Sequence, residues 1–180
     1  MIFFTSDLHL NHTNIIKYCN RPFNDVDHMN QTLIHNWNQV VSNKDEVYVL
    51  GDFCMGQPHQ WSGLVNQLNG TIHLILGNHD IRDYYMGMNR IKMRSVEKWQ
   101  YLEDNGHRYL LNHYPTGGFY PKNQTEPEHY DIALCGHVHE KWLVKEINGK
   151  PCVNIGVDQW DFTPVSMHRL NDFLKERNWI

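Results

Sequence analysis

The sequence has no long apolar run and no excess of basic residues, and each absence excludes a class of protein. No stretch approaches the roughly 18 apolar residues of a transmembrane helix, so we expect no membrane association. The opening MIFFTSDLHL has no basic segment before its apolar stretch and is interrupted by Asp7, which predicts a first strand instead of a signal peptide. The formal net charge of −4, without any Lys/Arg run, gives no support to broad contact with a nucleic-acid backbone.

Cysteine is also scarce, and the four that occur form no CxxC pair. Three of them lie in or beside apolar segments, so we expect small buried side chains with no metal role and a reducing, cytoplasmic compartment. Linkers, repeats and low-complexity segments are absent as well. We therefore predict one domain over residues 1–180, with no cap domain above its site.

Histidine, in contrast, is abundant: the chain has 13, against 16 Lys plus Arg. Imidazole is the commonest metal ligand in proteins. Several histidines stand with carboxylates directly after apolar strands, at the edge where α/β sheets bind ligands. One such placement is ordinary, but five in succession indicate a shared site. The residues are Asp7 and His9 after MIFFTS, Asp52 after VYVLG, Asn78, His79 and Asp80 after LILG, His113 after YLLN, and His137 and His139 after ALCG.

Strands and helices alternate in the first half of the chain, with helices predicted at about residues 14–19, after a cap at Asp27, and over WSGLVNQL. Hairpin signals follow in the second half, where Asn-Gly pairs at 105–106 and 148–149 separate apolar runs. A last helix is predicted at about 167–177. This order indicates a mixed sheet system with helices outside. The longest stretch without predicted structure, 116–129, is a candidate for substrate contacts.

Seven of the strand-end residues form a donor set of oxygens and imidazoles without thiolate, which suits Mn²⁺, Fe²⁺ or Zn²⁺. One catalytic zinc needs only three protein ligands, so seven suffice for two ions if a carboxylate bridges them. Two ions about 3.5–4 Å apart form a clamp for displacement at phosphorus. We expect two divalent cations, with Mn²⁺ as the first choice and Fe²⁺, Zn²⁺, Ni²⁺ or Co²⁺ as alternatives. Their residual positive charge would attract an anion such as a phosphate ester.

The order of the motifs resembles the calcineurin-like metallophosphoesterases. The motifs are DLH at 7–9, GD at 51–52, GNHD at 77–80, an isolated His113 and GHVH at 136–139, so the resemblance extends over most of the chain. Protein phosphatases of this family carry GNHE, whereas GDFCMG and GNHD stand here. The stretches DLHLNHTNII, NRPF and VDQWDFTPV resemble instead a short subgroup found in bacteria and their phages.

The resemblance implies a fold and a division of labour in the site. The fold is a four-layer α/β/β/α sandwich of two mixed β-sheets flanked by helices, with the metal site at the carboxyl ends of the strands. His79 would face the ester, as a leaving-group acid or transition-state stabiliser, and Asp80 would orient its imidazole. The implied ligands are Asp7, His9 and His139 for one metal, Asn78, His113 and His137 for the other, and Asp52 as the bridge.

The implied activity is hydrolysis of a small or nucleotide-type phosphodiester by attack of a metal-bridging hydroxide. A phosphomonoesterase would use the same clamp, and the sequence does not separate the two. A nuclease is a further alternative, but the negative net charge of the chain makes binding to a nucleic-acid backbone less favourable. A non-catalytic scaffold is disfavoured because the ligands and His79 are all present. The expected partner is a small phosphate ester, with nucleotides among the candidates; nucleic acid and the oligomeric state stay open.

Two residues outside the motifs are candidate substrate contacts. His12 lies three residues past His9, where a helix begins, and its alternative role is a helix cap or a surface side chain. Arg21 lies in the turn NRPF and could hold phosphate oxygens through its planar guanidinium, or be a solvated charge. Asp158 and Trp160 follow the strand CVNIG and are candidates for the same rim, although packing is favoured for Trp160.

Overall fold

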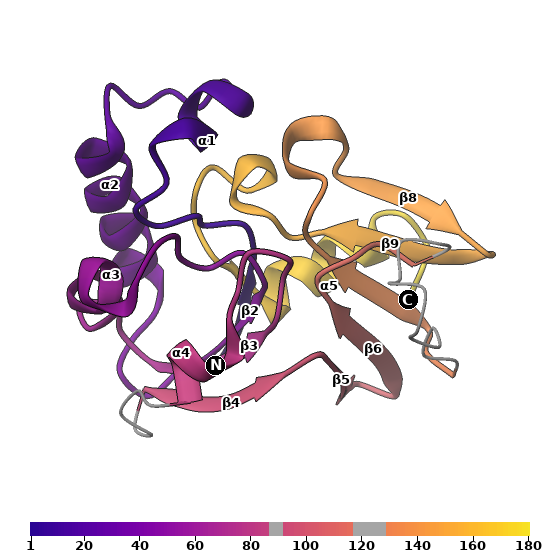
Figure 1. The fold of residues 1–180 in the computed structure, drawn as a ribbon. Helices are drawn as coiled ribbons and strands as arrows, with labels where there is room; N and C mark the ends of the chain where they lie inside the picture. The colour runs from indigo at the N-terminus through magenta and orange to yellow at the C-terminus, as the bar shows by residue number, and fades with distance from the viewer. Residues whose placement is uncertain (87–91, 117–128) are drawn as a thin grey trace.

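The computed structural model describes residues 1–86, 92–116 and 129–180, and in it two five-stranded mixed sheets face one another (Figure 1). In the first sheet, of order β10-β1-β2-β3-β4, only β10 is antiparallel to its neighbour. Its strands are β1 (Ile2–Thr5), β2 (Glu46–Leu50), β3 (Thr71–Ile75), β4 (Met93–Glu97) and β10 (Val165–Ser166). The mixed sheets agree with the predicted fold class, whereas most of the loop 116–129 lies outside the described residues.

The second sheet has the order β5-β6-β7-β9-β8, with β6, β7 and β9 parallel and the two edge strands antiparallel. Its strands are β5 (Trp99–Asp104), β6 (His107–Asn112), β7 (Ile132–Cys135), β8 (Val144–Ile147) and β9 (Lys150–Asn154). The β5–β6 and β8–β9 hairpins turn at the two predicted Asn-Gly pairs, and in both the Asn and the Gly have positive φ, which those residues tolerate best.

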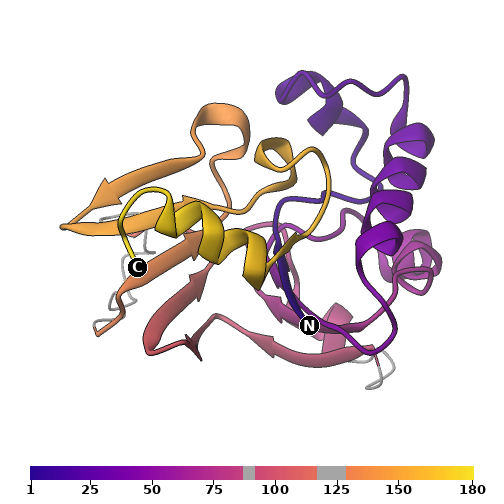
Figure 2. The same ribbon diagram turned by 180° about the vertical axis from the view of Figure 1, so that it is seen from behind.

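Helices flank the sheets. One face of the first sheet is covered by α1 (Thr13–Tyr18), α2 (Val26–Val40) and α3 (Pro58–Val65). On the other face, α5 (Met167–Lys175) packs against Phe4 and Leu50 and lies in front of the strands in Figure 2. The short elements are α4 (Arg82–Met86), η1 (His139–Lys141) and η2 (Val157–Gln159). No helix within the described ranges combines the length and apolar character that crossing a bilayer would require.

The buried core has one layer on each face of the first sheet. Residues such as Val47 and Val49 pack with Trp37 and Trp61 of the helices, while Phe4, Leu50 and Ile75 pack with the second sheet and α5. Because these parallel strands are buried on both faces, they are nearly continuous apolar runs in the sequence. Polar residues in these strands lie mainly at the strand ends, with His73 inside β3 as an exception.

The start of α2 differs from its prediction. The cap is Asp25, whose carboxylate accepts the backbone N–H of His28 at 2.8 Å, and the predicted cap Asp27 lies inside the first turn. Asp25 has the extended backbone that a capping residue needs, with φ −154° and ψ 179°.

Candidate metal centre

The structure brings all seven predicted ligand residues together at one edge of the two sheets. The centre of the cluster is Oδ2 of Asp52, which is buried. It lies 3.5 Å from Nε2 of His9, 3.7 Å from Nε2 of His113 and 4.0 Å from Nε2 of His79. Asp52 therefore lies between His9 on one side of the cluster and His113 on the other.

The donors fall into two groups around Asp52. Ligand atoms of Asp7, His9 and His139 all lie within 4.8 Å of one another, and so do those of Asp7, Asp52 and His113. In the second group, Oδ1 of Asn78 lies 3.0 Å from Nε2 of His113 and 3.0 Å from Nδ1 of His137.

The second group is completed by His137, whose Nδ1 is 3.2 Å from Nε2 of His113. Burial lowers the pKa of His137 to about 4, with the neighbouring His113 acting in the same direction. The imidazole is therefore held neutral, which is the form that binds a metal.

Five of the seven residues have a left-handed backbone, which is uncommon for side chains other than glycine. The φ angles are 55° at Asp7, 51° at His9, 51° at Asp52, 70° at His137 and 47° at His139. Such conformations cost about 1–3 kcal/mol each and persist where the surrounding structure stabilises them, often at functional sites. In this protein, the left-handed conformations direct these five side chains toward the metal-type cluster just after the strands end.

The glycines of two motifs are required by close approach. A Cβ at Gly77 would lie 2.3 Å from Oδ1 of Asp52, and a Cβ at Gly136 would lie 2.3 Å from Oδ2 of Asp7. Both distances are far below van der Waals contact, so any side chain there would displace a carboxylate of the site. This explains why GNHD and GHVH begin with glycine.

The donor set fits divalent cations. Nε2 of His9 is buried and has no hydrogen-bond partner, an arrangement that costs free energy unless a partner is bound. Burial lowers the pKa of His9 far below its usual range, and the nearby His139 and Arg21 lower it further. Burial also raises the pKa of Asp7. Metal ions at this point would pair the free nitrogen and compensate the buried carboxylates.

His139 is oriented from behind by Asp158. Its Nδ1 lies 3.1 Å from Oδ2 of Asp158, and its Nε2 lies 3.8 Å from Oδ1 of Asp7. Burial opposes the charged form of His139, but hydrogen bonds to Asp158 and Cys19 and the charge of Asp7 raise its pKa to about 10. Without a metal this environment keeps His139 protonated, so a metal binding at Nε2 would have to displace a proton, while Asp158 would keep its hydrogen bond to Nδ1.

Arg21 holds Asp158 in place, which corrects its predicted role as a substrate contact. Its side chain is fully buried, with Nε 2.8 Å and one terminal nitrogen 2.9 Å from the two carboxylate oxygens of Asp158. It also donates to the carbonyl oxygens of Asp7 and Leu8. A guanidinium with these partners is neither solvated nor open to substrate.

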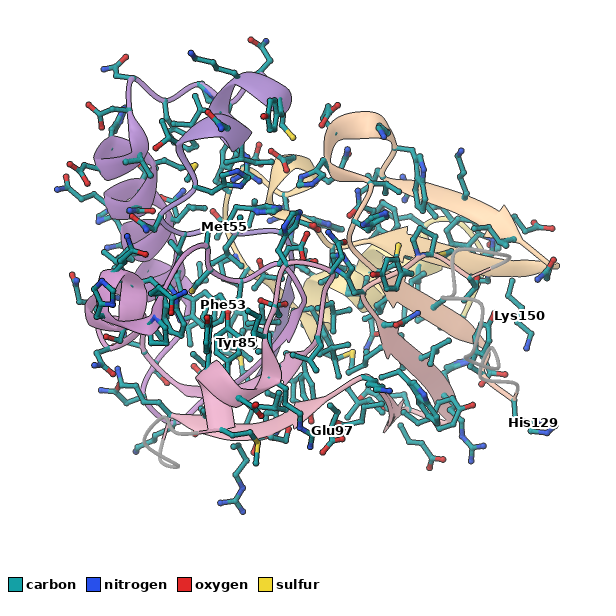
Figure 3. The ribbon with its side chains drawn as sticks, in the orientation of Figure 1. Phe53, Met55, Tyr85, Glu97, His129 and Lys150 are labelled. Carbon is teal, nitrogen blue, oxygen red and sulfur yellow. The ribbon has the colours of Figure 1, made fainter. Side chains whose placement is uncertain are left out.

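The role predicted for Asp80 is also corrected. One carboxylate oxygen accepts the backbone N–H groups of Asp52 and Gly77, and the other accepts the N–H of Phe53 and the hydroxyl of Tyr85. The rings of Phe53 and Tyr85, both labelled in Figure 3, are stacked with their centroids 6.1 Å apart. Asp80 therefore positions the backbone that carries Asp52, and not the imidazole of His79.

Of the remaining predicted residues, His79 and His12 lie at the edge of the cluster and Trp160 lies in the core. The side chain of His79 is 42% exposed, and its backbone N–H donates to Oδ1 of Asp52. Nδ1 of His12 is 3.2 Å from Nδ1 of His9, and although His12 precedes α1 its side chain makes no capping hydrogen bond. Trp160 is buried and donates to the carbonyl of Asn154, so its role is packing.

Sequence reasoning missed Asn154, the last residue of β9. Its side-chain amide donates to the carbonyls of His139 and Trp142, and its oxygen accepts the N–H of Gly156. It holds the loop that carries His139. The signal was available, because Asn154 is a polar residue at the end of an apolar strand, like the predicted ligands.

Replacing Asp158 by Asn should weaken metal binding at the side of the site that contains His139. Losing the partner behind a ligating histidine typically costs about 10- to 100-fold in metal affinity. Mn²⁺ titration by calorimetry should show this loss in one of two binding events. The matched control is Asp161→Asn, an exposed carboxylate in the same loop, for which the affinity should not change. Equal affinities in Asp158→Asn and wild type would remove the orienting role.

Comparisons with known proteins agree with the geometry. The family model described as "Calcineurin-like phosphoesterase superfamily domain" matches residues 1–167. An uncharacterised protein of Methanocaldococcus jannaschii is 38% identical over 172 residues, covering 92% of this chain and 86% of that protein. The Gene 66 protein of Mycobacterium phage L5 is 28% identical over 183 residues, covering 87% and 86%. The chain belongs to the calcineurin-like phosphoesterase superfamily, and its phage relative fits the short subgroup.

Solved structures agree on the fold. A protein of unknown function from Aquifex aeolicus superposes with a TM-score of 0.75 at 24% identity, covering 96% of this chain and 98% of that one. Yfce, a phosphoesterase from E. coli, gives a TM-score of 0.52 at 17% identity, covering 85% and 77%. At these identities the likeness defines the fold alone.

Proposed function

We propose that the protein is a two-metal phosphodiesterase acting on small or nucleotide-type phosphodiesters. The observation that carries the proposal is the position of Asp52 Oδ2, 3.5 to 4.0 Å from the Nε2 atoms of three histidines. In this proposal Asp52 is shared by two ions. The other ligands are Asp7, His9 and His139 for one ion and Asn78, His113 and His137 for the other.

Two divalent cations at this point would supply an activated water at neutral pH and neutralise charge on the phosphoryl oxygens. The chain's own residues would do the rest. Asp80 holds the backbone of Asp52 and Gly77, and Asp158 holds His139, so the donor set is preorganised. His79 is the half-exposed donor beside the cluster, and we assign it to the leaving oxygen.

A diester is favoured over a monoester because space adjoins the donors. A cavity of about 370 Å³ opens beside His9, His79 and His139. A monoester presents only its phosphoryl oxygens and one ester group, whereas a diester carries a second organic group that must be accommodated next to the site. The cavity provides that room.

The proposal is tested with a panel of esters and metals. Protein loaded with Mn²⁺ should hydrolyse bis(p-nitrophenyl) phosphate with a higher kcat/KM than p-nitrophenyl phosphate, and chelation should abolish both activities. A higher kcat/KM for the monoester would support the phosphomonoesterase alternative. Cleavage of single-stranded DNA that falls steeply with salt would support a nuclease. Absence of turnover with Mn²⁺, Fe²⁺, Zn²⁺, Ni²⁺ and Co²⁺ would contradict an enzymatic role.

A further inference from the structure

The cavity beside the metal cluster has a definite shape and composition. It lies between α1 and η1, which face one another in Figure 1, and its inner end is formed by His9, His79 and His139. Its volume of about 370 Å³ is within the range of small-molecule sites. An occupant of the cavity would therefore be in direct contact with His79, which is assigned to the leaving oxygen, and with the proposed metal ligands His9 and His139.

One wall of the cavity is apolar and aromatic. It is formed by Ile15 and Tyr18 of α1 together with Met55, which is labelled in Figure 3. Tyr18 is 71% exposed, although large aromatic side chains usually bury their rings. Its ring stands edge-on to that of His12, with the centroids 6.3 Å apart and the planes at 79°. Tyr18 thus presents a free aromatic surface at the cavity that leads to the metal cluster.

The opposite wall is charged. Glu140 and Lys141 of η1 line the cavity directly after the ligand residue His139. A hydrogen-bond acceptor and a cation are therefore available across from the aromatic wall. A flat ring with polar groups on its edge would match both walls, since its face could stack on Tyr18 while its edge met the charged side chains. A plain alkyl group would leave Glu140 and Lys141 without a partner in the occupant.

We propose that this cavity is a ring subsite, which binds a planar, polar-edged ring such as a nucleobase on the non-reacting ester group of the substrate. This inference rests on the proposed function and narrows its substrate class. Tyr18 is the stacking residue, and Met55 and Ile15 complete the apolar wall. The phosphodiester would then lie at the inner end of the cavity, beside His79.

The first test compares two diesters that share a leaving group. Thymidine 5′-(p-nitrophenyl) phosphate and methyl p-nitrophenyl phosphate both release nitrophenolate, so they differ only in the non-reacting group. The wild-type protein loaded with Mn²⁺ should have the higher kcat/KM for the thymidine ester. Ribose 5-(p-nitrophenyl) phosphate, which lacks the ring, should behave like the methyl ester.

Variants assign the preference to Tyr18. Tyr18→Ala should lower the thymidine-to-methyl ratio of kcat/KM by about 5- to 100-fold, the range expected for loss of one base–aromatic stack. Tyr18→Phe keeps the ring and should keep the ratio. Lys17→Ala, an exposed residue of the same helix outside the cavity, is the matched control and should not change it. The melting temperature of each variant shows whether α1 is intact.

A binding measurement makes the test independent of turnover. Saturation-transfer NMR with metal-free protein and thymidine 5′-monophosphate should show stronger saturation of the base protons than of the sugar protons, and Tyr18→Ala should remove that difference. Equal kcat/KM for the thymidine and methyl esters, with no saturation of the base, would overturn the ring subsite while leaving the phosphodiesterase intact. Hydrolysis of neither ester, with base saturation observed, would contradict the proposed activity and keep the subsite as a binding site.

Discussion

Asp52→Asn should abolish most of the hydrolytic activity and lower the metal content of the protein. Oδ2 of Asp52 lies 3.5 Å from Nε2 of His9 and 3.7 Å from Nε2 of His113, one donor from each group, so the substitution removes the charge that both ions would share. The loss of kcat/KM should exceed about 100-fold, the upper end of what loss of a hydrogen-bond partner behind a metal ligand costs. The measurements are kcat/KM on bis(p-nitrophenyl) phosphate and metal analysis of the same sample.

The matched control for this variant is Asp27→Asn, which removes an exposed carboxylate from the first turn of α2. It changes the net charge of the protein equally and should leave both activity and metal content unchanged. Near wild-type turnover of Asp52→Asn with full metal content would show that Asp52 does not bridge.

His79→Ala should separate chemistry from metal binding. His79 is not among the assigned ligands, so metal content should be retained while the rate falls by about 10²- to 10⁴-fold, the usual contribution of a positioned acid. The loss should be larger for alkyl esters than for nitrophenyl esters, because nitrophenolate leaves without needing a proton. A series of diesters with leaving groups of increasing pKa measures this difference as a slope.

The control for His79→Ala is His35→Ala, which removes an exposed histidine of α2. Two outcomes would contradict the assignment in different ways. An equal loss on all leaving groups would exclude general-acid catalysis and retain only electrostatic stabilisation by His79. Loss of metal in His79→Ala would instead show that His79 is a ligand.

The positions of the metal-type residues could be predicted because they follow from one rule of sheet architecture. An apolar strand that ends in a carboxylate or imidazole places it at the carboxyl edge of the sheet, and parallel strands share that edge. Asp7, Asp52 and Asn78 follow β1, β2 and β3, while His113 and His137 follow β6 and β7. The sequence pattern of polar residues after apolar strands therefore predicts which residues lie close together. It does not predict which of their atoms face one another.

The partners of Arg21 and Asp80 could not be predicted in the same way. Arg21 is 137 residues from Asp158 along the chain, and only the folded structure brings the turn NRPF against η2. Asp80 is next to His79 in sequence, which suggested that it orients the imidazole. Its carboxylate instead turns to the backbone N–H groups of residues 52, 53 and 77, because these buried donors need an acceptor.

Apolar runs and turn residues in the sequence predict the buried strands well and the edge strands less well. Strands such as β2 and β3 are apolar runs, and the hairpins of the second half carry Asn-Gly turns. The edge strand β4 was not predicted, since MRSVE exposes Arg94 and Glu97 and lacks a continuous apolar pattern. Its strand form comes from pairing with β3, which is a tertiary effect.

The number of metal ions bound per chain tests the central claim most directly. Metal-free protein is titrated with Mn²⁺ while free Mn²⁺ is followed by electron paramagnetic resonance, and the bound ions are examined for magnetic coupling. We expect two ions per chain that are coupled in the wild-type protein and uncoupled or absent in Asp52→Asn. Saturation at one ion per chain, or two ions whose spectrum does not depend on Asp52, would contradict a binuclear centre bridged by this carboxylate.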